Sequence, residues 1–242
     1  MRSPLAPAET VRADFDRLAG FGAAVFDHNR HYHGVLLREL EGRRLHAALD
    51  LGCGTGDFSR QLAVRADAVL GVDLSPGMLH VARASAGDLP NLRFEERDVT
   101  AWELPRAHFD CIASIATLHH LPMAPTLMRL REALAPGGML LVLDLVRDAT
   151  PLDFARSLLA IPTNLLLHLA KTGALRDPPA LRAAWLAHGR TDHYLSIAEV
   201  RRACADAGLH GARVRRHLLW RYSLVWRRPP DQVPRGRSPA AR

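Results

Sequence analysis

The sequence predicts an α/β protein built on a doubly wound sheet. Its apolar runs are short, and they alternate with segments of helical periodicity at the spacing of βαβ units. One of these units contains a glycine-rich turn with Gly52, Gly54 and Gly56. The run at residues 139–145 is nearly all apolar, as expected for a central parallel strand.

The first βαβ unit begins with an apolar run at residues 47–51 and turns at the three glycines into a helix that starts near Asp57. Because glycine carries no side chain, a ligand can lie directly against the main chain of this turn. A second apolar run, residues 68–72, ends in Asp73. A strand, a glycine-rich turn, a helix, a strand and a terminal acid together predict a site for an adenosine-containing ligand.

The remaining elements follow the same alternation. Residues 9–19 have apolar positions at helical spacing, and Ser75 and Pro76 are a good N-cap and first residue for a helix at 76–86. Ser196 and Glu199 form a capping box that opens a helix through residue 207. Further strands are expected at residues 91–95, 109–115, 139–145, 212–219 and 222–226, a helix at 123–134, and a tight turn at 136–138.

Composition limits the class of protein. With 48% apolar residues the chain can bury a substantial core. Three distant cysteines, Cys53, Cys111 and Cys204, argue against a disulfide framework, and none has the spacing of a zinc ligand. No segment reaches the roughly 20 apolar residues of a membrane span, and the N-terminus lacks a signal-peptide core. We therefore expect a soluble protein of the reducing cytoplasm.

The net charge of +7 is concentrated at the C-terminus. Residues 227–242 hold five arginines and one aspartate, which gives +4 and leaves +3 for the other 226 residues. The proline- and arginine-rich segment 229–242 has almost nothing apolar to bury, so it is expected to be a disordered, solvated tail. This distribution argues against a dedicated nucleic-acid surface on the folded part.

Asp57 stands where a dinucleotide-binding turn would have its third glycine. A carboxylate there disfavours a pyrophosphate and suits a ligand with a cationic end. Through residues 49–56 (Leu-Asp-Leu-Gly-Cys-Gly-Thr-Gly) the sequence resembles the class I S-adenosylmethionine-dependent methyltransferases. The resemblance extends over residues 30–146 and, less closely, 194–228. It implies a Rossmann-like seven-stranded sheet in one methyltransferase domain (1–228), with an N-terminal helical cap (1–40) and a helical insertion (147–193) after strand five.

The resemblance also implies the cofactor, S-adenosylmethionine, and its product, S-adenosylhomocysteine. Asp50 would face the cationic amino group, Asp73 would accept both ribose hydroxyls, and Asp98 would hold the adenine amino edge. An acid within a strand, as at Asp50, is costly without a partner, which favours a functional role. The implied cofactor residues are Asp50, Gly52, Cys53, Gly54, Gly56, Asp73, Leu74, Met78, Asp98, Val99, Ser114 and Ile115.

The acceptor side has several candidates for a general base. His119 follows strand four and is expected to face the pocket, whereas His120 is expected to be a hydrogen-bonded structural residue. His31 and Tyr32 belong to a polar cluster at residues 28–33 that either is a solvated loop plus the start of a helix or folds over the cofactor. His193, Tyr194 and a mechanism without a base are further alternatives. No cysteine pair or carboxylate accompanies the histidines of 28–33, so no metal site is expected.

The insertion and the acceptor allow more than one interpretation. Apolar residues of the insertion are expected to pack against the core, or to form a pocket for an apolar or aromatic acceptor; they are Leu158, Leu159, Ile161, Leu165, Leu166 and Leu169. The leading hypothesis is methyl transfer to an oxygen, nitrogen or carbon atom of a small molecule. The alternatives are an RNA-directed methyltransferase of the same fold and a non-catalytic S-adenosylmethionine-binding protein. Residues 114–117 lack the motif of enzymes that methylate base amino groups.

Overall fold

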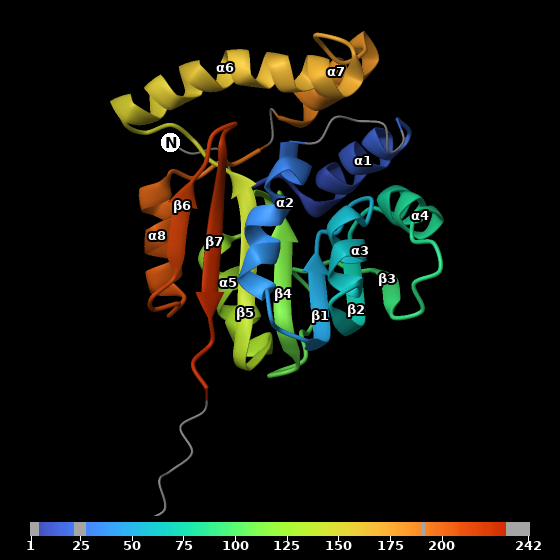
Figure 1. Ribbon diagram of the computed structural model, residues 1–242, viewed down its shortest axis with the longest axis vertical. Helices are drawn as coiled ribbons and strands as arrows, with labels where there is room; N and C mark the ends of the chain where they lie inside the picture. Colours follow the sequence, from blue (N-terminus) through green and yellow to red (C-terminus); the bar gives the residue numbers. More distant parts are fainter. Residues whose placement is uncertain (1–4, 22–27, 190–191, 231–242) are drawn as a thin grey trace, which may run out of the picture.

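The computed structural model describes residues 5–21, 28–189 and 192–230 (Figure 1). Seven strands form one sheet in the order β3-β2-β1-β4-β5-β7-β6. The first five strands are parallel, and β7 runs antiparallel to both β5 and β6. This confirms the predicted seven-stranded, doubly wound sheet. The strands are β1 (Leu45–Leu51), β2 (Ala66–Asp73), β3 (Leu92–Glu96), β4 (Phe109–Ile115), β5 (Leu134–Leu145), β6 (Arg213–Arg216) and β7 (Arg221–Arg227).

Both faces of the sheet are buried, as a parallel sheet requires. One apolar cluster contains Leu49, Ile112 and Leu140, and the other contains Leu62 and Leu141 together with Leu36 and Leu40. Alternate residues of each strand thus enter opposite clusters. The flanking helices are α3 (Asp57–Ala63), α4 (Pro76–Ala84), α5 (Met123–Ala133) and α8 (Ile197–Asp206), and α8 opens with the predicted capping box.

Helix α2 (His28–Leu37), followed by the short η1 (Arg38–Leu40), packs on one face of the sheet against β5 (Figure 1). The other helices, α1 (Ala8–Ala19), α6 (Pro151–Thr172) and α7 (Pro179–His188), lie over the carboxyl ends of the parallel strands. Sheets of this type bind ligands at that edge. The described helices include none that is both long and apolar enough to cross a membrane.

The structure corrects two local expectations, and parts of the predicted tail and cap lie outside the described residues. The polar cluster at residues 28–33 forms the start of α2, so the expected helix start is present and the expected loop is wrong. Residues 136–138 belong to β5, where a register shift replaces the expected tight turn. A Cβ on Gly138 would lie 2.9 Å from the Phe109 carbonyl oxygen, so only glycine allows this close pairing. Within the predicted tail and cap, residues 231–242, 1–4 and 22–27 lie outside the described residues.

The apolar face of α6 is exposed, so the prediction that it packs against the core is wrong. Leu158 and Leu166 are 70% and 67% exposed, and the other four predicted core residues are at least 42% exposed. The helix instead packs through Ala160 and Leu167, on a different side of its surface. Helical periodicity alone identified an apolar face without indicating whether another element covers it.

Candidate functional site

A cavity of about 750 Å³ lies at the carboxyl ends of β1, β2 and β4. Side chains of α1, α2 and α7 also line it, among them Phe15, His33 and Trp185. Most residues predicted to bind the cofactor share this cavity. They are Asp50, Gly52, Cys53, Gly54, Asp73, Leu74, Met78, Asp98, Val99 and Ile115.

The glycine-rich turn between β1 and α3 depends on left-handed backbone. Gly52, Gly54 and Gly56 have φ angles of +69°, +52° and +74°, which L-residues with side chains rarely adopt. A Cβ on Gly52 would lie 2.7 Å from Thr117 Cβ, whereas one on Gly54 would meet no atom within 4 Å. Gly52 therefore allows close packing of two loops, and Gly54 leaves main chain open toward the cavity.

Asp50, near the end of β1, is a fully buried carboxylate. Its Oδ2 accepts a hydrogen bond of 2.6 Å from the Ser59 hydroxyl, while Oδ1 has no partner among the described residues. Burial raises the pKa of Asp50 to about 7, and the nearby Asp73 carboxylate adds to the rise. An atom of this kind can accept a hydrogen bond from a cationic ligand.

Asp73 ends β2 and organises two loops. Its Oδ2 accepts from the Gly54 N–H at 2.8 Å, and its Oδ1 accepts from the Ser75 N–H at 2.9 Å. Burial raises its pKa despite these hydrogen bonds. Two carboxylate oxygens have about four acceptor positions, so the side chain can still bind hydroxyl groups of a ligand.

Asp98 forms a local turn and also lines the cavity. Its Oδ1 accepts from the Thr100 N–H at 2.8 Å and from the Thr100 hydroxyl at 2.6 Å, which is a turn-forming arrangement. The same residue lines the cavity, next to Val99. The turn thus holds the carboxylate at the cavity wall.

His119 faces the cavity, as expected, and it is held by Asp144 of β5. Its Nδ1 lies 2.6 Å from Asp144 Oδ1, and its backbone N–H donates to Oδ2 at 3.0 Å. This pair fixes the ring and leaves Nε2 directed away from Asp144. A carboxylate that orients an imidazole in this way is a common support for a histidine base.

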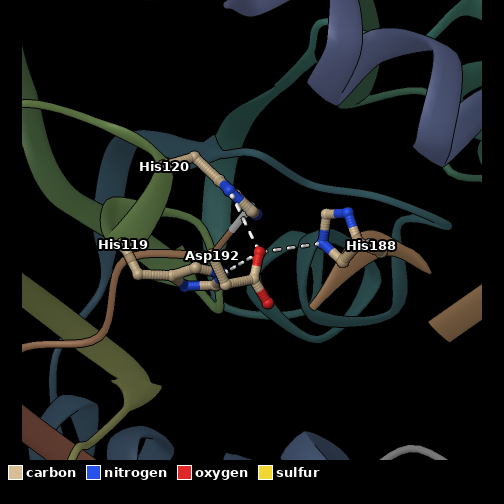
Figure 2. Close-up of side chains that lie close together, drawn as sticks. All are labelled: His119, His120, His188 and Asp192. Atoms are coloured by element: carbon tan, nitrogen blue, oxygen red, sulfur yellow. Dashed lines mark ion pairs between the residues drawn. The ribbon is translucent and has the colours of Figure 1, made fainter. Parts of the chain in front are cut away.

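His119, two further histidines and an aspartate lie close together, with the aspartate between the three imidazole rings (Figure 2). His120 follows it in the short helix η2 (Leu118–His120), His188 ends α7, and Asp192 lies four residues beyond His188. His120 is expected to be a hydrogen-bonded structural residue. Its Nε2 contradicts this expectation, because that atom is buried without a hydrogen-bond partner among the described residues. Burial, together with His119 and His188, lowers the pKa of His120 to about 2.

Four predicted site residues do not line the cavity. Tyr32 is buried and donates a hydrogen bond of 2.6 Å to the Leu218 carbonyl oxygen, and His31 is exposed. The Ser114 hydroxyl donates to the Leu51 carbonyl oxygen at 3.2 Å within the sheet. Gly56 is the N-cap of α3 and packs against Phe94. The structure therefore does not bring His31 or Tyr32 to an acceptor.

Sequence reasoning missed several residues in the cavity wall or directly behind it. Asp144, which holds His119 from behind, could have been found, because it is an acid in an otherwise apolar strand, which was the argument for Asp50. His188 and Asp192 lack a comparable signal, since their position depends on how the insertion folds back. The buried Arg221 of β7 also lines the cavity and donates a hydrogen bond of 2.7 Å to Asn29 Oδ1.

Comparison with known proteins agrees with the site. A model of the methyltransferase domain matches residues 48–138. An uncharacterised methyltransferase of Mycobacterium tuberculosis is 32% identical over 209 residues, which cover 83% of this chain and 96% of the relative. A trans-aconitate 2-methyltransferase of Deinococcus radiodurans is 50% identical over 97 residues, 39% of this chain and only 36% of that protein.

Solved structures show the same fold. The complex of DhpI with SAH superposes with a TM-score of 0.64 at 21% identity, and the match covers 93% of this chain and 98% of DhpI. The fold and the cavity at the glycine-rich turn define a Rossmann-like, nucleoside-binding enzyme. The chain belongs to the class I S-adenosylmethionine-dependent methyltransferases.

Proposed function

We propose that this enzyme transfers a methyl group to a small molecule bound beside the cofactor. The supporting observation is that one cavity of about 750 Å³ contains both the predicted cofactor residues and a group of buried polar side chains. Pockets for small ligands typically measure about 300–1,000 Å³. An oxygen, nitrogen or carbon atom of the acceptor fits this scheme.

The cofactor end of the cavity has the groups that S-adenosylmethionine needs. Asp50 Oδ1 is buried without a partner among the described residues, so we assign it to the cationic amino group, directly or through water. The free acceptor positions of Asp73 suit the ribose hydroxyls. The adenine would pack between Leu74 and Met78, with its amino edge at Asp98 and the Val99 backbone.

The acceptor end holds the proposed base, His119. When bound, S-adenosylmethionine supplies a methyl group activated on a sulfonium, so the protein has only to align the acceptor and remove its proton. Asp144 holds His119 Nδ1 at 2.6 Å, and Nε2 is thereby available to accept a proton in the cavity. His31 and Tyr32, which do not line the cavity, are weaker candidates for this role.

A carboxylic acid is the first acceptor class to test. The buried Arg221 guanidinium lines the cavity and can pair with a carboxylate. Relatives named trans-aconitate 2-methyltransferase match the central part of the chain. An RNA acceptor is the weaker candidate, because side chains of α1 and α7 line the cavity and the excess charge is concentrated in residues 227–242.

The proposal is tested by calorimetry and by product formation. We expect S-adenosylmethionine and S-adenosylhomocysteine to bind at micromolar concentration and dinucleotides not to bind. S-adenosylhomocysteine release is then measured with panels of small carboxylic acids, phenols and amines, and with RNA. Release with RNA alone would refute the small-molecule assignment.

The base is tested on the best acceptor of that panel. His119→Gln should lower kcat by about 10²-fold or more, the usual contribution of a positioned base, and leave the Kd of S-adenosylhomocysteine unchanged. Tyr32→Phe is the matched control, because the Tyr32 hydroxyl is bound to Leu218 outside the cavity. An unchanged kcat in His119→Gln would exclude His119 as the base.

A further inference from the structure

Three histidines in the cavity wall direct one ring nitrogen each toward a single carboxylate oxygen. His119 Nε2, His120 Nδ1 and His188 Nε2 lie 3.8, 3.7 and 3.4 Å from the same atom, Asp192 Oδ1 (Figure 2). These separations exceed ordinary hydrogen-bond lengths. Asp192 is 4% exposed at its side chain, and its Oδ1 has no hydrogen-bond partner in the described part of the chain.

We propose that His119, His120, His188 and Asp192 bind a divalent transition-metal ion of the zinc type. One ligand atom from each residue lies within 4.8 Å of all the others. A tetrahedral zinc ion with bonds of about 2.0–2.1 Å keeps its ligand atoms roughly 3.3 Å apart. The three nitrogen–oxygen distances of 3.4–3.8 Å are close to the edges of such a tetrahedron.

The residues behind these four support metal binding. Asp144 holds Nδ1 of His119 at 2.6 Å, and Asp14 of α1 lies 3.3 Å from Nδ1 of His188. Both rings therefore direct Nε2 toward Asp192, which is the usual arrangement of a metal-binding histidine backed by a carboxylate. The Tyr194 hydroxyl donates to the other oxygen of Asp192 and fixes that carboxylate.

Charge and donor type indicate which ion binds. A buried carboxylate with an unpartnered oxygen is costly unless a cation balances it, and a metal ion would supply that charge. Three imidazole nitrogens with one carboxylate oxygen suit zinc, cobalt and nickel, whereas magnesium and calcium prefer oxygen ligands. We therefore expect zinc to bind and magnesium not to bind.

The proposed ion would connect distant parts of the fold. His119 and His120 follow β4, whereas His188 and Asp192 belong to the insertion. Four protein ligands form a closed site, which is typical of structural metals. While the ion is bound, Nε2 of His119 has no free lone pair, so the base proposed above acts in the metal-free enzyme.

Zinc binding is measured on the untagged full chain, stripped with a chelator and desalted, with neither cofactor nor acceptor present. Its result is therefore independent of the proposed function. A zinc titration against a chromophoric chelator should give one ion per chain, and cobalt should give the visible absorption of tetrahedral coordination. Failure of the wild-type protein to bind zinc would overturn the inference whatever the variants do.

Two variants identify the ligands. His188→Gln and Asp192→Asn should each weaken zinc binding by more than about 100-fold, because even residues behind the ligands are worth about 10–100-fold. His80→Gln, at an exposed position of α4, is the matched histidine control and should bind zinc like the wild type. Zinc should also protect the insertion from proteolysis in wild type and not in His188→Gln. Equal zinc affinity in all three variants would refute the assignment.

Discussion

Asp50 gives the sharpest prediction about the cofactor site, because burial raises its pKa to about 7. A cationic amino group beside this carboxylate would favour its ionised form, so cofactor binding should lower the pKa. The free enzyme must then lose a proton to bind when the pH is below about 7. Cofactor affinity should therefore fall as the pH falls through this range.

The size of the effect follows from the titration. Between pH 8 and pH 6, a free-enzyme pKa of about 7 weakens binding by about tenfold, or ~1.4 kcal/mol, if the bound group stays ionised. Calorimetry of S-adenosylhomocysteine in buffers with different ionisation enthalpies measures both the affinity and the proton release. Asp50→Asn should weaken binding and also remove the pH dependence. An affinity that is constant from pH 8 to pH 6, or an equal slope in Asp50→Asn, would refute the assignment.

The raised pKa of Asp50 also predicts how the stability of the ligand-free protein depends on pH. The pKa of Asp50 is higher in the folded state (about 7) than its ordinary value of 3.8. The contribution of Asp50 to the free energy of unfolding is thus fully present below about pH 4. It is lost as the pH rises through 7, and the loss is at most ~4 kcal/mol. At pH 8, Asp50→Asn should raise the melting temperature of the ligand-free protein while it weakens cofactor binding. A lower melting temperature would contradict the buried-charge argument.

Three further substitutions test separate parts of the site. Asp73→Asn should weaken S-adenosylhomocysteine binding about 10–100-fold in calorimetry, because charge-assisted hydrogen bonds to hydroxyls are worth roughly 1.5–3 kcal/mol. Gly52→Ala should lower the melting temperature more than Gly42→Ala, since only the first introduces a Cβ that collides with Thr117, although both have φ near +70°. Tyr32→Phe should cost about 1 kcal/mol in denaturant unfolding and leave cofactor affinity unchanged.

Each of these has an outcome that contradicts it. Full affinity in Asp73→Asn would exclude the ribose contact. Equal melting temperatures for the two glycine variants would mean that backbone strain, and not the Thr117 collision, sets the cost. A weaker cofactor affinity in Tyr32→Phe would restore Tyr32 to the site.

The sheet could be predicted from the sequence because each strand has a local signal. Strand β4 was expected at residues 109–115 and is Phe109–Ile115. The glycine-rich turn and Asp73 were found for the same reason, since three closely spaced glycines after one strand and an acid after the next are typical of a nucleoside site. Most of the cofactor end of the cavity is therefore encoded locally.

The acceptor end could not be predicted in this way, because its residues come together only through tertiary contacts. His188 and Asp192 belong to an insertion whose path over the sheet has no short sequence signature. Periodicity placed six apolar residues of α6 in the core, yet all are exposed. Tyr32 was a candidate base because it belongs to the polar cluster at residues 28–33. The Leu218 carbonyl oxygen, however, accepts its hydroxyl hydrogen bond outside the cavity.

The same physical argument applies to two buried carboxylates, one at the cofactor end of the cavity and one at the acceptor end. Among the described residues, Asp50 and Asp192 each leave one buried oxygen without a hydrogen bond, and both line the same cavity. Each such atom costs at least about 1–3 kcal/mol in the ligand-free protein. A fold retains a destabilising group of this kind where a ligand removes the cost. The cationic amino group would satisfy Asp50 and the proposed metal ion would satisfy Asp192, so saturating both ligands should raise the melting temperature by more than either ligand does alone.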